Sequence, residues 1–233
     1  MPKVLSAAQF IQKLKTYRPP EKQKKAGEES ESMGVPMREV FALAKEFMDM
    51  PPAEIEKLLE SPVHEVRAGA VSIMDWQARS KKTSEARRKE LFDLYIRRHD
   101  RINDWDLVDR SAPYVVGGYL FDKPRSILYK LARSKNRWER RTAIVSTYYF
   151  IRKGDLEDTF KIAEILVHDD EDLVQKAVGG WVREAGKKDP QKLLDFLDRY
   201  AASMPRTTLR YAIEHLSRAQ KDHYMGLKKE KLS

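Results

Sequence analysis

The chain of 233 residues carries 45 lysines and arginines against 36 aspartates and glutamates, so its formal charge is +9. Hydrophobic residues make up 41% and charged residues 35% of the sequence, which excludes both a disordered tail and an integral membrane protein. The chain has no cysteine, and this excludes disulfides, thiolate metal sites and cysteine nucleophiles.

The N-terminal residues 1–17 alternate like an amphipathic helix and lack the continuous apolar core of a signal peptide. No apolar run approaches the roughly 20 residues that cross a bilayer. A cytoplasmic protein is therefore the simplest expectation. Positive charge is concentrated in residues 1–27, in residues 79–101 and in the tail from Lys187. Such a spread favours an extended surface for a polyanionic partner.

Helical periodicity covers almost the whole chain from Pro36 onward. The first helix is expected over residues 6–17, and the polar stretch after it, up to Gly34, is predicted to be a loop. The later helices are expected over residues 37–48, 52–59, 62–78, 84–98, 103–116, 124–134, 137–152, 156–167, 170–186, 190–202, 205–216 and 219–227. Their short connections predict antiparallel neighbours. We expect an N-terminal helix and polar loop over 1–35 and a repeat domain over 36–233, within a single structural domain.

A common register relates the second helices of successive pairs. An apolar, basic, small pattern recurs loosely at positions 68, 106, 141, 176 and 211, which are separated by 38, 35, 35 and 35 residues. This period is that of a two-helix repeat of the tetratricopeptide, HEAT or armadillo sort. Such stacks curve and present their second helices along a concave face. Small residues should let these helices pack closely, namely Ala68, Ala143 and Ala177.

The segment NDWDLVDRSAP, which begins at Asn103, combines a tryptophan with several carboxylates. Trp105 and Asp109 are four residues apart and should share one helix face. Asn103 is a good N-cap, and Asp106 completes a capping-box-like pattern and can pair with Arg110 at i+4. No lysine or arginine lies one turn from Asp109 along the helix. Asp109 beside the Trp105 indole is therefore the candidate functional pair.

Basic residues recur on the helices that should line the concave face. A repeated basic stripe suits duplex phosphate, where lysine and arginine neutralise charge without reading bases. A solvated helix face is the alternative explanation for each of these residues. The candidate phosphate ligands are Arg137, Arg140, Lys176, Arg183, Lys187 and Arg210.

No signature of a cofactor or metal site is recognisable in the sequence. The histidines show no ligand spacing and are expected at the surface or at helix ends; they are His64, His99, His168, His215 and His223. A Gly-rich phosphate loop and a GxSxG elbow are both absent. We therefore expect no metal and no cofactor, and any chemistry must come from Asp109 and its neighbours.

Several motifs resemble those of the DNA alkylation repair glycosylases of the AlkD type. These motifs are WDLVDRSAPYVVG, NRWERRTAIVS, QKAVGGWVREAGKKDPQKLLDFL and MPRTTLRYAIEHL, and the resemblance extends from about Gly34 to Leu216. It implies an all-α fold, a right-handed superhelical solenoid of HEAT-like two-helix repeats with a concave basic groove. It also implies a monomer that excises N3- and N7-alkylated purines, such as 3-methyladenine and 7-methylguanine, from double-stranded DNA.

The resemblance assigns roles to individual positions of this chain. The catalytic aspartate corresponds to Asp109, the tryptophan that packs against the sugar of the lesion to Trp105, and the arginine that holds the DNA backbone to Arg141. A second tryptophan of the family should stand at Gly180, but here the indole comes one residue later, as Trp181. A shift of one residue rotates a side chain by about 100° around a helix, so Trp181 is a candidate lesion contact that would project from a different helix face.

Two other functions are compatible with the same residues. A non-catalytic relative could bind distorted or branched DNA through the basic groove, and the missing indole at Gly180 favours that alternative. A helical-repeat scaffold for an acidic protein partner is the third hypothesis. Salt sensitivity of duplex binding separates the scaffold from the two DNA-binding functions, and catalysis separates those two from each other.

Overall fold

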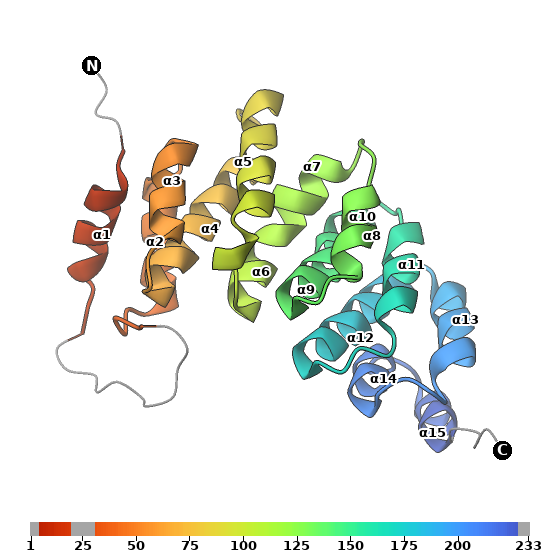
Figure 1. The fold of residues 1–233 in the computed structure, drawn as a ribbon. Coiled ribbons are helices and arrows are strands. Elements are labelled where there is room, and N and C mark those ends of the chain that lie inside the picture. The colour runs from red at the N-terminus through yellow and green to blue at the C-terminus, as the bar shows by residue number, and fades with distance from the viewer. Residues whose placement is uncertain (1–4, 20–30, 228–233) are drawn as a thin grey trace. The chain divides into compact units, whose positions relative to one another are not determined.

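The computed structural model describes residues 5–19 and 31–227 (Figure 1). Within these ranges every regular element is a helix, and the only extended pairing is a single bridge between Glu31 and Val63. The all-α fold class is confirmed. None of the described helices is long and apolar enough to span a membrane. Most of the polar stretch predicted to be a loop, residues 20–30, lies outside the described ranges.

The contacts divide the chain into two compact units, Met1–Tyr119 (unit 1) and Leu120–Ser233 (unit 2). The division falls within α7 (Gly118–Leu120). The remaining elements of unit 1 are α1 (Ala7–Lys15), α2 (Met37–Glu46), α3 (Pro52–Leu59), α4 (His64–Arg79), α5 (Glu85–Arg97), η1 (His99–Arg101), α6 (Trp105–Ser111) and the π-helix η2 (Ala112–Gly117). Those of unit 2 are α8 (Ser126–Ala132), α9 (Arg137–Ser146), α10 (Tyr148–Arg152), α11 (Glu157–Leu166), α12 (Asp172–Gly186), α13 (Pro190–Tyr200), α14 (Arg206–Ala212) and α15 (Arg218–Gly226).

The helices of each unit follow one another in pairs, such as α3 with α4 and α11 with α12. The second helices of successive pairs pack directly on one another. In unit 1, α4 packs against both α2 and α6, and in unit 2, α12 packs against both α9 and α14. Such stacking is what a two-helix repeat predicts, and the residue-by-residue register stays a prediction. Ala68, Ala143 and Ala177 are all buried.

Two glycines set how closely these helices approach their neighbours. A Cβ atom at Gly69 of α4 would collide with the Phe10 ring of α1, so α1 belongs to the packed core of unit 1. A Cβ atom at Gly179 of α12 would lie 2.6 Å from Tyr211 Cβ and would also meet the Thr208 carbonyl of α14. Both contacts are possible only because glycine has no side chain.

Two expected helices are interrupted. The helix expected over 103–116 continues past Pro113 as the π-helix η2, because proline has no N–H to donate and its ring clashes with the carbonyl of residue 109. The Gly118 N–H bonds the Pro113 carbonyl five residues earlier. The helix expected over 137–152 is divided into α9 and α10 at Thr147, whose hydroxyl donates to the Ile144 carbonyl at 2.7 Å.

The segment that leads into α2 is held by one buried carboxylate. Glu65, in the first turn of α4, is 3% exposed and accepts hydrogen bonds from the Ser32 hydroxyl at 2.7 Å, from the Met33 N–H at 3.0 Å and from the Gly34 N–H at 2.7 Å. Gly34 has a φ of +74°, a conformation that glycine adopts at little cost. Glu65 thus fixes residues 32–34 against α4.

Adjacent glycines of α12 provide a test of the helix packing. Gly179→Ala places a methyl group against the α14 backbone and should destabilise the protein by roughly 1 to 3 kcal/mol. Gly180→Ala enters open space and should stabilise the protein by about 0.5 to 1 kcal/mol through helix propensity. Urea denaturation followed by circular dichroism measures both changes. Equal effects of the two substitutions would show that α12 and α14 are not in close contact at Gly179.

Candidate functional site

Helix α6 begins one residue later than the sequence suggests. Asp104, and not Asn103, is the N-cap, because Asp104 has an extended backbone conformation and its Oδ1 accepts from the Trp105 N–H at 2.7 Å. Trp105 is therefore the first residue of the helix, and its side chain is 50% exposed. An indole that is half exposed at a helix start is available to a ligand.

Asp109 lies one turn after Trp105 on the same helix, as predicted. Its side chain is half-buried and has an interaction partner elsewhere in the chain. The backbone at Asp109 is also unusual, because the residue four positions later is Pro113 and the helix widens there into η2. Distortions of this kind frequently accompany functional positions.

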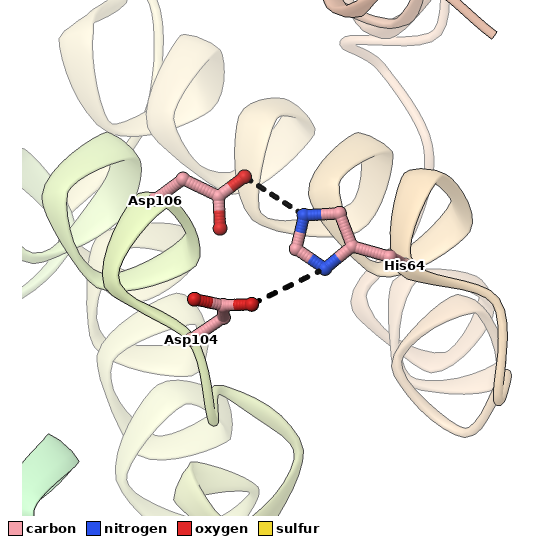
Figure 2. A group of neighbouring side chains, drawn as sticks. All are labelled: His64, Asp104 and Asp106. Atoms are coloured by element: carbon pink, nitrogen blue, oxygen red, sulfur yellow. Dashed lines mark hydrogen bonds and ion pairs between the residues drawn. The ribbon is translucent and has the colours of Figure 1, made fainter. Parts of the chain in front are cut away.

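Asp106 is engaged by a histidine that the sequence patterns did not identify (Figure 2). The predicted pairing of Asp106 with Arg110 is wrong: Asp106 Oδ2 lies 2.8 Å from His64 Nε2, and Asp104 Oδ2 lies 3.8 Å from His64 Nδ1. His64 is at a helix end, as expected, since it is the first residue of α4. The hydrogen bond that His64 donates to Asp106 raises the pKa of His64, although burial opposes the shift.

The His64 group is the one cluster with metal-ligating side chains among the described residues. One ligand atom from each of His64, Asp104 and Asp106 lies within 4.8 Å of the others. However, the two carboxylates face different ring nitrogens, and Nε2 is already hydrogen-bonded to Asp106 (Figure 2). A single ion binds only one nitrogen of an imidazole, so this arrangement is that of a hydrogen-bonded ion pair.

Arg110 turns instead towards a buried carboxylate of α4. Asp75 is fully buried and lies 2.8 Å from Arg79 Nε and 3.4 Å from Arg110 Nη2. The Arg110 guanidinium also stacks over the Phe41 ring at 4.8 Å. Burial raises the pKa of Asp75, and the two arginines oppose that shift. This cluster joins α2, α4 and α6, so it fixes the helix that carries Trp105 and Asp109.

The arginine assigned to the DNA backbone is buried in unit 2. Arg141, on α9, is 7% exposed and its Nη1 donates to the Leu173 carbonyl of α12. Neighbouring Arg140 is also engaged internally, because its Nε lies 2.6 Å from Asp169 Oδ2 and its Nη1 donates to the Ser134 carbonyl at 3.0 Å. Asp169 is itself almost fully buried. Arg140 is therefore poorly placed for phosphate, whereas the backbone-holding role of Arg141 stays a prediction.

The other candidate phosphate ligands are more accessible. Exposed side-chain fractions are 38% for Arg137 and Lys176, 47% for Lys187 and 21% for Arg183, and Arg210 is exposed. Four of them pair with carboxylates: Arg137 with Glu171, Lys176 with Asp172, Lys187 with Glu184, and Arg183 with Glu184 and Glu214. Exposed ion pairs of this kind contribute about 0 to 1 kcal/mol, so a phosphate can compete for the cations.

The repeat register brings charges together within unit 2. The pKa of Lys176 is raised mainly by its hydrogen bond to Asp172, and it also responds to Tyr211 and, in the opposite direction, to Arg141. Lys176 on α12 is therefore within electrostatic reach of Arg141 on α9 and of Tyr211 on α14. Trp105 and Asp109 belong to unit 1 and the candidate phosphate ligands to unit 2, so their meeting in one groove stays a prediction.

Trp181 belongs to the edge of a hydrophobic core. It packs on Tyr148 with ring centroids 5.1 Å apart and contacts the buried group of Ile151, Leu156 and Ala185. By contrast, a Cβ atom at Gly180 would meet nothing within 4 Å. The shift by one residue thus turns the indole against the edge of this core and leaves open space at Gly180, where the resemblance places the family's second tryptophan.

Replacing this indole should affect stability. Trp181→Ala removes contacts with Tyr148 and the adjacent core, and we expect a loss of about 2 to 4 kcal/mol in the free energy of unfolding. Chemical denaturation measures the change. A change below about 0.5 kcal/mol, the range of ordinary surface substitutions, would show that Trp181 is not a core residue.

Comparison with known proteins gives a consistent result. Residues 7–216 match the model of a family described as DNA alkylation repair enzyme. No individually curated protein gives a significant match. Among solved structures, the chain is similar to a predicted DNA alkylation repair enzyme from Enterococcus faecalis, with a TM-score of 0.65 and 17% sequence identity, covering 94% of this chain and 100% of that one. At this identity the likeness shows a shared fold.

Proposed function

The chain belongs to the DNA alkylation repair enzyme family, and we propose that it is a monofunctional DNA glycosylase. Its substrates would be N3- and N7-alkylated purines in duplex DNA, such as 3-methyladenine and 7-methylguanine. The observation that carries this proposal is the pairing, on one short helix, of a half-exposed indole at Trp105 with a carboxylate one turn later at Asp109.

The chemistry of the substrate explains why so small a site would suffice. An N3- or N7-alkylated purine is cationic, so its glycosidic bond is already weakened and the leaving base needs no protonation. As the bond breaks, C1′ gains oxocarbenium character. An ionised Asp109 carboxylate would stabilise that charge and orient the attacking water. Trp105 would offer its π-face to the positively charged lesion nucleotide and would reduce the local dielectric, which strengthens the interaction with Asp109.

The basic residues of unit 2 would supply affinity for the duplex. Arg137, Lys176 and Lys187 are exposed and paired only with surface carboxylates. Phosphate would replace those carboxylates and release condensed counterions. Arg141 would hold the backbone near the lesion, in keeping with the family resemblance. These contacts carry no base information, so recognition of the lesion would depend on its charge and its sugar.

Loss of the catalytic carboxylate is the direct test. Asp109→Asn should slow the release of 7-methylguanine from methylated duplex DNA by about 100-fold or more, because one fixed transition-state charge is removed. Duplex affinity and helicity should be nearly unchanged. Chromatography of released bases measures the rate, and Asp93→Asn, at an exposed carboxylate of α5, is the matched control. Wild-type activity in Asp109→Asn would exclude this residue as the catalytic group.

Duplex binding should depend on Lys176. Lys176→Ala removes one phosphate contact, so the slope of log Kobs against log salt concentration should become shallower by about 0.9. Arg133→Ala, at an exposed arginine that follows the outer helix α8, should leave the slope unchanged. Fluorescence anisotropy at several salt concentrations measures both. Identical slopes in the two variants would remove Lys176 from the DNA interface.

The open space at Gly180 supports a second candidate function. With Trp181 turned against the edge of the core, one aromatic wall of the expected cleft is missing, and a non-catalytic protein that binds distorted DNA would need no such wall. The same release assay separates the two functions, since a binding protein would retain salt-sensitive affinity for duplex DNA without releasing methylated bases.

A further inference from the structure

His64 contacts both residues that flank Trp105 in the chain (Figure 2). Its Nε2 lies 2.8 Å from the Asp106 carboxylate and its Nδ1 lies 3.8 Å from the Asp104 carboxylate. The His64 side chain is 18% exposed, and its Nδ1 is buried with no hydrogen-bond partner among the described residues, so its approach to Asp104 is a charge contact and not a hydrogen bond. One ring from the start of α4 therefore faces the carboxylates of the two residues on either side of Trp105 in the chain.

The two-sided contact favours one protonation state of the ring. Only the imidazolium has an N–H on both nitrogens, whereas neutral histidine would turn a lone pair towards one of the two carboxylates. Asp104 is further fixed because its Oδ1 caps the Trp105 N–H. A charged His64 thus holds both Asp104, the N-cap of α6, and Asp106, in the first turn of the helix.

We propose that His64 is a positioning residue: its imidazolium clamps Asp104 and Asp106 and thereby fixes the first turn of α6, from which the Trp105 side chain projects. His64 touches neither the substrate nor the reacting atoms in this role. The proposal deepens the glycosylase function and rests on it, because an indole that packs against the lesion must be held in one orientation. Misplacement of a positioning group by about 1 Å can reduce a rate by as much as roughly 100-fold.

The sign of the pH dependence follows from the groups that face the ring. Asp106 and Asp104, from the start of α6, raise the pKa of His64, while burial and Arg67 on α4 lower it, and the net shift is upward. In the unfolded chain the histidine titrates near its usual pKa of about 6.5. The clamp therefore contributes its full stabilisation below about pH 6.5 and loses it as the pH rises through the elevated folded pKa.

The first test observes Trp105 without requiring catalysis. Protein labelled with 5-fluorotryptophan is followed by fluorine NMR between pH 5 and 9, with the Trp105 resonance assigned by its loss in Trp105→Phe. We expect this resonance to titrate with a midpoint above about pH 6.5 in the wild type and in His215→Gln, an exposed control. It should not titrate in His64→Gln. A titration that persists unchanged in His64→Gln would overturn the proposal.

The second test measures base release from methylated duplex. His64→Gln should be about 10- to 100-fold slower than the wild type near pH 6, and this ratio should fall towards one as the pH rises through the pKa of His64 in the folded protein, where the wild type loses its own clamp. Asp104→Asn, which removes one carboxylate from the same clamp, should show the same trend. A ratio that is constant with pH would contradict positioning by a charged histidine.

A cation that does not titrate provides the rescue experiment. His64→Arg keeps a positive charge and several N–H donors between the two carboxylates, so it should restore base release near pH 6 and make it independent of His64 titration. A His64→Arg variant as slow as His64→Gln at pH 6 would count against the clamp.

The two proposals can fail separately. If wild-type protein releases no methylated base while the Trp105 resonance still follows His64, the glycosylase function fails and the clamp stands. If the wild type releases base and neither the resonance nor the rate depends on His64, the clamp fails and the glycosylase function stands.

Discussion

Successive second helices approach each other so closely that some of their contact positions have no room for a side chain. Gly179 of α12 meets the backbone of α14. Because this contact is made with backbone atoms, the rotation of α12 is fixed relative to α14. Equivalent positions of consecutive helices are then placed side by side, which is how Lys176 comes to share its electrostatic environment with Arg141 and Tyr211.

Local sequence patterns predicted the helices well, because periodicity and Pro or Gly punctuation are local properties. They failed where the deciding contact is distant in sequence. Arg110 had a carboxylate one turn away at Asp106, yet it pairs with Asp75, which is buried and in greater need of a counter-charge. His64 and Asp106 are separated by 42 residues, so no spacing rule joins them. Asn103 and Asp104 are both good N-cap residues. Which of them caps α6 is decided by the backbone dihedral angles, which residue type alone does not reveal.

The candidate site was predictable in part for the same reason. Trp105 and Asp109 are related by one helical turn, and the sequence alone places them together. The basic residues are different, since a helical stripe does not show which cations are already committed. Arg140 is held by a buried aspartate and two carbonyls, whereas the carboxylates that meet Lys176 and Lys187 are 58% and 28% exposed. Burial of the partner therefore distinguishes a structural arginine from a cation that a phosphate can recruit.

Position 180 also has a practical consequence. The natural chain contains no cysteine, and a side chain at Gly180 would extend into open space from the helix that carries Lys176 and Arg183. A cysteine introduced there would be the sole thiol of the protein. It would accept a disulfide tether from a modified oligonucleotide or a spin label without competing reactions. The residue that lacks a side chain is thus a ready attachment point for locating α12 relative to a bound duplex.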